Sequence, residues 1–216
     1  MTSPVAPALV LASGSTARLR LLREAGIDAE VVVSGADETN DDHLATADLV
    51  AVLAERKAAT VAATRPDALV LGCDSMLDLH GSAYGKPATA QEAIELWHEL
   101  SGQEGTLYTG HWLIDGRSGR HASGVGATAI RFGTPSDAEI EAYAATGEPL
   151  SLAGAFSIDG LAAPFVDSIH GDPNNVIGLS LPLLRDLPKA QRRRSVISAN
   201  CPGKVRPSIS GTEGIL

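Results

Sequence analysis

Short apolar runs that end in small or polar residues alternate along this chain with segments of helical periodicity. Strands are predicted at 8–13, 29–35, 68–73, 106–115, 123–133, 154–160 and 164–172. Helices are predicted at 16–25, 45–64, 89–101, 134–147 and 180–187, with a hairpin through Gly81. Strand–helix–strand successions favour parallel pairs, whereas hairpins give antiparallel pairs. The pattern therefore predicts an α/β fold built on a mixed sheet.

The charge of the chain is unevenly distributed. The 216 residues carry a net charge of −9, yet residues 189–216 contain six Lys or Arg and one Glu. Residues 1–188 therefore carry about −14, and a body this acidic repels polyanions, which argues against nucleic acid as a partner. We expect residues 1–188 to form one domain and residues 189–216 to be a basic, poorly ordered tail.

The sequence has no apolar run near the roughly 20 residues that a membrane-spanning helix needs. Its apolar start lacks the basic segment that precedes the core of a signal peptide. Cys73 and Cys201 have neither the spacing of a metal site nor the number of a disulfide framework. These features predict a cytoplasmic protein with no membrane partner.

The stretch LASGSTARLRLLREAGI near the N-terminus predicts a strand, a turn and a helix in succession. Arg18 falls in the first turn of this helix, and no acidic residue precedes Glu24. A cation at a helix N-terminus is unfavourable by roughly 0.3–1 kcal/mol, because the unpaired N–H groups there carry positive charge. Either the arginines point into water, or Ser13, Ser15 and Arg18 together bind an anion.

Two further polar groups follow predicted strands, namely Asp74 with Ser75, and Asp167 with 171–172. Ligands of α/β sheets collect beyond the carboxyl ends of strands, so we expect these groups to meet the first one. Asp74 ends an apolar strand, where a buried carboxylate needs a counter-ion or hydrogen bonds. A capping or turn role is the alternative. Lys86 follows shortly and is placed to approach the same loops.

An acidic loop spans 37–42, and Glu38 within it could supply a second oxygen ligand for Mg²⁺ or Mn²⁺. A solvated loop is the alternative. The stretch GSAYGKPA looks like a phosphate-binding P-loop, but its glycines are too close together. No serine-hydrolase or zinc-hydrolase pattern is present, and we predict that His43, His98 and His111 are surface or strand-end residues.

Four longer stretches occur in a fixed order: LASGSTARLRLLREAGI, LGCDSMLDLHGSAYGKP, LSGQEGTLYTGHWLI and AGAFSIDGLAAPFVDSIHGDPNNVIGLSLPLL. Together they resemble the Maf-like nucleoside triphosphate pyrophosphatases, also labelled septum formation inhibitors, and the actinobacterial branch most of all. The resemblance covers about 9–184. It implies a long mixed sheet flanked by helices, two lobes with a central cleft, and a fold similar to the inosine triphosphate pyrophosphatases. Residues 1–188 would then be a single two-lobed catalytic domain.

The resemblance also implies an activity. Members of the family cleave a nucleoside triphosphate between its α and β phosphates and release the monophosphate and pyrophosphate, with a divalent cation (Mg²⁺, Mn²⁺ or Co²⁺) as cofactor. The expected partner is therefore a nucleoside triphosphate, and a homodimer is expected from the resemblance alone. The alternative is a non-catalytic nucleotide-binding regulator of septation. A regulator that only binds nucleotide has no need of a base beside the phosphates.

The family's functional residues match positions of this chain one by one. Asp74 matches the acidic catalytic residue, and Lys57 and Lys86 match the two lysines that act with it. Glu38 and Asp74 would hold the metal. The residues implied in substrate binding are Ser13, Ser15, Arg18, Ser75 and Asp159.

Two positions depart from the family pattern. Ala17 stands where many relatives have a first arginine, and Asp159 replaces the amide of a family "IQG" motif. An ionised carboxylate accepts hydrogen bonds but cannot donate them, so Asp159 would either favour a base edge rich in donors or serve the metal. The preferred base, and whether the nucleotide is standard or modified, therefore stay open. Arg20 and Arg23 are predicted to be solvated.

Overall fold

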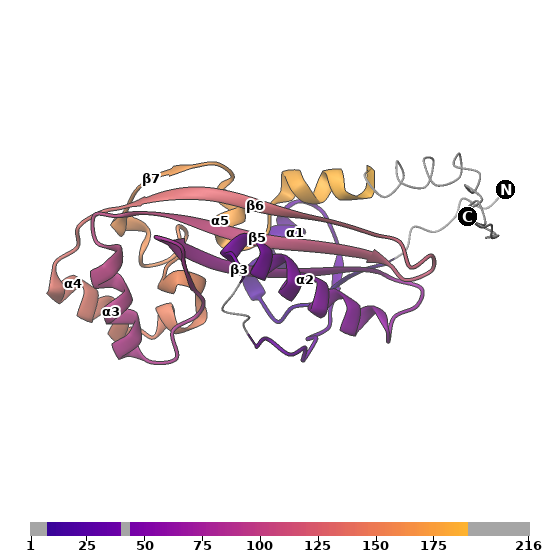
Figure 1. Cartoon of the computed structure of the whole chain (residues 1–216), viewed down its shortest axis with the longest axis horizontal. Helices are drawn as coiled ribbons and strands as arrows, with labels where there is room; N and C mark the ends of the chain where they lie inside the picture. The colour runs from indigo at the N-terminus through magenta and orange to yellow at the C-terminus, as the bar shows by residue number, and fades with distance from the viewer. Residues whose placement is uncertain (1–7, 40–43, 190–216) are drawn as a thin grey trace, which may run out of the picture.

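The structure, a computed structural model, describes residues 8–39 and 44–189. Two long antiparallel strands, β5 and β6, form the middle of the molecule, as Figure 1 shows. The strands are β1 (Leu9–Leu11), β2 (Ala29–Val31), β3 (Leu69–Leu79), β4 (Ser82–Tyr84), β5 (Glu104–Asp115), β6 (His121–Phe132) and β7 (Val166–His170). The helices are α1 (Thr16–Glu24), α2 (Thr46–Ala62), α3 (Ala90–Leu100), α4 (Asp137–Ala145), α5 (Pro173–Ile177) and a helix over 181–189. Short 3₁₀ turns are η1 (Glu148–Ser151), η2 (Ala153–Ala155) and η3 (Ala163–Phe165).

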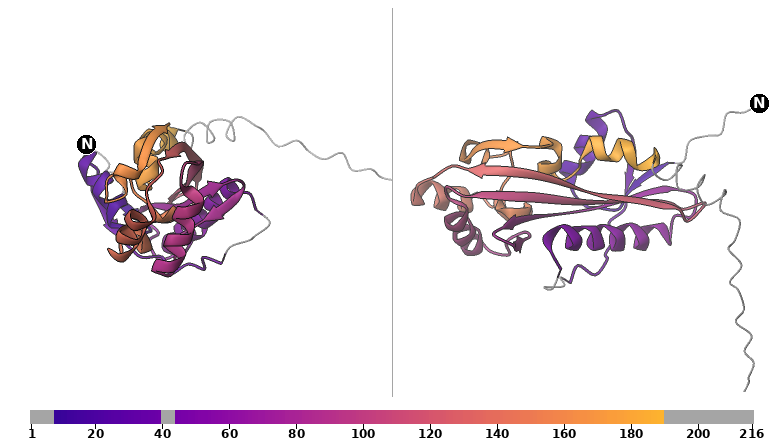
Figure 2. Two further views of the ribbon diagram at one scale, coloured as in Figure 1. Left: turned by 90° about the vertical axis from the view of Figure 1, so that its left-hand side faces the viewer. Right: turned by 45° about the horizontal axis from the view of Figure 1, so that its top comes forward.

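The seven strands form one sheet in the order β2-β1-β3-β5-β6-β7, with β4 paired to β3. β1 is parallel to both β2 and β3, and the remaining pairs are antiparallel. The long α2 covers one face of the sheet, while the helix over 181–189 lies on the opposite face (Figure 2). This arrangement confirms the predicted mixed sheet flanked by helices.

The hydrophobic core is divided between the two ends of the long strands. At one end, Trp97 of α3 is fully buried and meets the rings of Phe132 and Tyr143 edge-on, with both pairs of ring centroids 5.8 Å apart. At the other end, separate apolar clusters lie beneath α1 and α2, around Leu22 and Val61 respectively. The two lobes stay a prediction. The likeness to inosine triphosphate pyrophosphatases stays a prediction.

Glycines let α2 approach the sheet closely. A Cβ atom added at Gly110 would lie 2.1 Å from the carbonyl oxygen of Val50, and one at Gly72 would lie 2.2 Å from that of Ala54. Val50 and Ala54 are one helical turn apart, so they form one ridge along α2. The backbone of α2 therefore rests directly on β5 and β3.

β3 is unpaired over part of one edge. It pairs with β1 as far as Leu71 and with β4 only from Leu77 onward, whereas its other edge pairs with β5 from Leu69 to Asp78. Residues 72–76 thus have no strand beside them on that edge, within the part of the chain that the structure describes. We call this interruption the β3 notch.

The notch corrects one prediction. The strand predicted at 68–73 continues to Leu79, because β5 pairs with it throughout. Asp74 and Ser75 therefore lie inside a strand and not at its end. Their polar side chains are compatible with a buried strand because both are hydrogen-bonded.

Three other predictions need correction. The strand predicted at 154–160 is wrong, because the segment starts in η2 with Gly154 at a φ of +69° and continues as a turn. The strand predicted at 29–35 ends at Val31, and α5 was not expected. The hairpin through Gly81 and the other predicted helices and strands are confirmed, with shifted ends.

No helix of the described segments is long and apolar enough to cross a membrane. The predicted tail at 189–216 lies outside the described residues, apart from Lys189. His43 and Cys201 also lie outside them.

Candidate active site

A cavity of about 920 Å³ opens at the β3 notch. All of the residues predicted for the site line it: Ser13, Ser15, Arg18, Glu38, Lys57, Asp74, Ser75, Lys86 and Asp159. The third predicted polar group does not join them, because Asp167 and Asp172 are absent from the lining. Asp172 instead caps α5 by accepting a hydrogen bond from the backbone of Asn174 at 2.9 Å. The expectation that this group meets the others is therefore wrong.

Asp74 and Ser75 are neighbours in β3, so their side chains point to opposite faces of the sheet. Asp74 faces α2, on the same side as Gly72, whereas Ser75 faces α1 and α5. A strand pairing along the notch would separate the two faces. Because none does, both side chains reach the same cavity around the open edge of β3.

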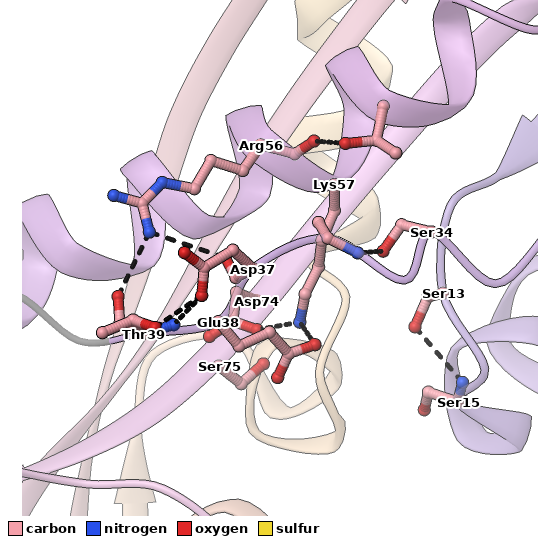
Figure 3. Close-up of polar contacts among 12 residues, drawn as sticks. Ser13, Ser15, Ser34, Asp37, Glu38, Thr39, Arg56, Lys57, Asp74 and Ser75 are labelled. Carbon is pink, nitrogen blue, oxygen red and sulfur yellow. Dashed lines mark hydrogen bonds and ion pairs between the residues drawn. The ribbon is translucent and has the colours of Figure 1, made fainter.

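Lys57 joins two carboxylates. Its Nζ donates a hydrogen bond to Asp74 Oδ1 and lies 3.0 Å from Glu38 Oε1, as Figure 3 shows. Lys57 and Asp74 are buried, whereas the side chain of Glu38 is exposed. Arg56, the residue before Lys57, donates to the carbonyl oxygen of Thr39 at 3.1 Å and so ties the loop that carries Glu38 to α2.

The donor set at this end of the cavity fits a divalent cation that is shared with a ligand. The ammonium group of Lys57 offsets the charge of only one of the two carboxylates, so Asp74, Glu38 and Lys57 together carry one net negative charge. The described residues contain no group of three or more His, Cys, Asp or Glu that could hold a metal ion. Mg²⁺ in phosphate sites commonly takes one or two carboxylates and completes its shell with phosphate oxygens and water. Asp74 and Glu38 suit that arrangement.

Arg18 is buried, and neutral groups hold it. Its Nε donates to the carbonyl oxygen of Gly178 at 2.7 Å, Nη1 to Ser13 Oγ at 3.0 Å and Nη2 to Ser75 Oγ at 2.9 Å. These bonds use three of the five N–H groups of the guanidinium. One N–H on each terminal nitrogen has no acceptor among the described residues, and a guanidinium can bind a phosphate or carboxylate through two such groups.

Among the described residues, no carboxylate forms an ion pair with Arg18. A buried charge without a counter-ion is unfavourable. The first turn of α1 contains no acidic residue, and its N-cap is Ser15, which accepts from the backbone N–H of Arg18 at 3.3 Å. The exposed Lys86 lines the same cavity. This end of the cavity is therefore prepared for an anion.

Arg20 and Arg23 are both exposed, as expected, but Arg20 also has a partner that was not predicted. Arg20 donates a hydrogen bond to Asp159 Oδ2, and Ser157 donates one to Asp159 Oδ1. Burial by itself raises the pKa of Asp159, but the hydrogen bonds from Ser157 and Arg20 and the charge of Arg20 outweigh it and lower that pKa. Asp159 is therefore an ionised acceptor in the cavity wall.

His111 is a polar residue of the site region that the sequence did not point to. It is 1% exposed, so the prediction of a surface or strand-end residue is wrong for it, whereas His98 is half-exposed as expected. Burial first, and then the charge of Arg18, lower the pKa of His111 to about 4. The sequence does contain a pattern that indicates burial of His111. Side chains alternate between the two faces of β5, so His111 and Thr109 share a face with the buried Leu107 and Leu113.

The fold and the cavity together define an α/β protein with a cleft suited to an anionic ligand. The chain belongs to the Maf family: the family model described as Maf-like protein matches residues 8–190. The resemblance seen in the sequence is therefore confirmed.

Relatives of the chain carry one common name, nucleoside triphosphate pyrophosphatase. The protein of that name from Streptomyces coelicolor is 58% identical over 182 residues, which is 83% of this chain and 88% of the relative. The one from Streptomyces avermitilis is 54% identical over 190 residues, or 87% and 92%. The one from Synechococcus elongatus is 51% identical over 182 residues, or 84% and 92%.

Proposed function

We propose that this protein is a nucleoside triphosphate pyrophosphatase, which hydrolyses the α–β phosphoanhydride bond to give a nucleoside monophosphate and pyrophosphate. The observation that carries the proposal is Arg18, a buried guanidinium that has no counter-ion among the described residues and lines a cavity with a carboxylate. The name shared by relatives at 51–58% identity supports the same activity.

Three cations would bind the phosphate chain. Arg18, at the N-terminus of α1, offers the two N–H groups that no acceptor in the described residues uses. Lys57 enters from α2 and Lys86 from the segment after β4. A triphosphate thus supplies the negative charge that the first turn of α1 lacks, and the cations stabilise the charge that develops on the departing pyrophosphate.

Asp74 would act as the general base. A water molecule attacks the α-phosphorus and gives its proton to the Asp74 carboxylate, while the bond to the bridging oxygen breaks and pyrophosphate leaves with the electron pair. The hydrogen bond from Lys57 fixes the orientation of one carboxylate oxygen, Oδ1. Oδ2 is then the oxygen that takes the proton.

Asp74 and Glu38 would hold a divalent cation, Mg²⁺, Mn²⁺ or Co²⁺, together with phosphate oxygens. When bound, such an ion neutralises charge on the phosphate groups and polarises them. The excess negative charge of the two carboxylates over Lys57 supports this assignment.

The nucleoside would lie against the turns that follow α4. Leu152, Phe156, Ser157 and Asp159 of these turns line the cavity. Apolar surface with a few placed polar groups is typical of a site that binds a base. Asp159, with one oxygen held by Ser157 and the other by Arg20, would accept hydrogen bonds from donors on the nucleoside.

Replacing Asp159 with glutamine is expected to change the order of preferred nucleotides. The amide can donate as well as accept, so the ratios of kcat/KM among nucleotides should shift by about tenfold. Glu24→Gln is the matched control, because Glu24 is the other carboxylate near Arg20, at 3.9 Å, and does not line the cavity. Unchanged ratios in the Asp159 variant would show that this residue does not contact the nucleoside.

A panel of standard and modified nucleoside triphosphates tests the proposed function. Each nucleotide is incubated with the protein and Mg²⁺, Mn²⁺, Co²⁺ or a chelator, and monophosphate and pyrophosphate are measured. We expect the two products in equal amounts with at least one metal and none with the chelator. Tight binding of nucleotide without any product would instead favour the regulator of septation.

We also propose a cytoplasmic location, because nucleoside triphosphates are cytoplasmic metabolites and Cys73 is a free buried thiol. A homodimer remains a proposal from the family resemblance. The acidic body of the chain supports the expectation that nucleic acid is not a partner.

A further inference from the structure

Two chains of hydrogen bonds lead away from the Arg18 guanidinium, and both reach β5. In the first, Arg18 donates to Ser75 Oγ at 2.9 Å, and Ser75 Oγ lies 2.9 Å from Thr109 Oγ1. Thr109 Oγ1 donates to the carbonyl oxygen of Asn175 at 3.0 Å, so Ser75 must be the donor to Thr109. This chain fixes one terminal nitrogen of Arg18 to the middle of the sheet.

The second chain passes through His111. Arg18 Nε donates to the carbonyl oxygen of Gly178 at 2.7 Å, and two residues later the backbone N–H of Ser180 donates to His111 Nε2 at 2.9 Å. His111 Nδ1 then donates to the carbonyl oxygen of Thr109 at 3.0 Å. The two chains therefore meet at Thr109 and close a ring around the guanidinium.

The segment after α5 has little freedom in this ring. Gly178 ends α5 at a φ of +117°, and a Cβ atom there would lie 3.2 Å from Arg18 Nε. Its backbone thus touches the guanidinium directly. One link from β5 to this segment is the imidazole of His111, which is 69 residues distant from Ser180 in the sequence. Both ring nitrogens are used by backbone groups, so the bonds also fix which nitrogen carries the proton.

We propose that His111 is a positioning residue for the proposed reaction, and that it acts on the phosphate chain only through Arg18. By holding Ser180 to β5, the imidazole places the Gly178 carbonyl where it orients the guanidinium. The two N–H groups of Arg18 that have no acceptor among the described residues would then be held in a fixed direction for the phosphate chain. This inference rests on the proposed function, because it takes Arg18 as a phosphate-binding residue.

Substitution of His111 by asparagine and by glutamine separates this role from mere packing. A glutamine side chain is long enough to place an oxygen near the position of Nε2 and accept from Ser180, whereas an asparagine side chain reaches only the position of Nδ1. We expect His111→Asn to raise KM for the preferred nucleotide by about tenfold, with a smaller change in kcat, since an interaction lost in both ground and transition states appears in KM. We expect His111→Gln to restore KM to within about threefold of wild type. His98→Asn, on the exposed face of α3, is the matched control.

A second measurement does not depend on activity. Because Arg18 Nε–H is buried and hydrogen-bonded, it should give a resolved, slowly exchanging nitrogen-15 signal in the wild-type protein. The signal should persist in His111→Gln and exchange at least about tenfold faster in His111→Asn. If the wild type released no pyrophosphate, the proposed function would fail while this signal still decided the role of His111.

The two measurements on the His111 variants have outcomes that either support or overturn the inference. A raised KM and faster exchange in His111→Asn, both restored in His111→Gln, support the inference. Equal effects of the two substitutions, or a KM and an Arg18 signal that neither substitution changes, overturn it. If His111→Asn does not fold, the folded His111→Gln protein decides, because loss of its Arg18 signal contradicts the proposed ring.

Discussion

Replacing Asp74 with asparagine is expected to lower the rate of pyrophosphate release by about 10²–10⁴-fold, because a general base contributes about that much. The amide keeps the shape of the side chain and still accepts the hydrogen bond from Lys57 through its oxygen. It cannot take a proton from water. Nucleotide affinity and the melting temperature should therefore change much less than kcat, which a single-turnover assay and thermal unfolding would establish.

Asp67→Asn is a matched control for this substitution. Asp67 precedes the same strand, its side chain is 87% exposed, and it lies away from the cavity lining. Its loss should leave the rate unchanged. Wild-type turnover in purified, folded Asp74→Asn protein would remove Asp74 from the role of base.

Replacing Gly110 with alanine is expected to lower the free energy of unfolding by about 3 kcal/mol, at the upper end of the usual cost of overpacking. The added methyl group would lie 2.1 Å from the carbonyl oxygen of Val50, and a backbone atom cannot rotate away. α2 must therefore move off the sheet. Gly110 is the register partner of Asp74, so the movement should also separate Lys57 from Asp74 and reduce activity. Chemical denaturation and pyrophosphate release measure the two effects.

Gly124→Ala on the neighbouring strand β6 is the comparison that isolates the cause. Its added methyl group would meet the end of the Leu183 side chain at 2.8 Å, which can rotate. We expect a loss of about 1 kcal/mol or less, with activity retained. Equal losses in the two variants would mean that the close approach of α2 is not what makes Gly110 necessary.

Much of the fold was predictable because local patterns agree with it. Apolar alternation placed β5 and β6, and the cap at Thr89 placed α3. The length of β3 was not predictable, because Asp74 and Ser75 read as the end of an apolar run and only pairing with the distant β5 extends the strand. The segment 154–160 has the composition of a strand, but Gly154 adopts a left-handed conformation there.

The residues of the candidate site were predictable for a different reason. Polar residues near the ends of apolar runs pointed to Ser13, Arg18 and Asp74, and the family resemblance added Lys57 and Asp159. All of these residues line one cavity. The hydrogen bonds of Arg20 and His111 were not predicted, because their partners are distant in the sequence. Asp159 lies 139 residues from Arg20, and Ser180 lies 69 residues from His111. No local pattern reports a hydrogen bond across such a separation.

The β3 notch also separates two tasks that a nucleotide enzyme must perform. Asp74 and Ser75 are consecutive residues of a paired strand, so covalent geometry sets the spacing between the proposed general base and the anchor of Arg18. The residues proposed to contact the nucleoside belong instead to turns between 148 and 160, which carry no sheet pairing. Substitutions in those turns would therefore change the nucleotide specificity without moving the residues proposed to act on the phosphate chain. A protein built in this way can acquire a new substrate specificity during evolution and keep the same reaction.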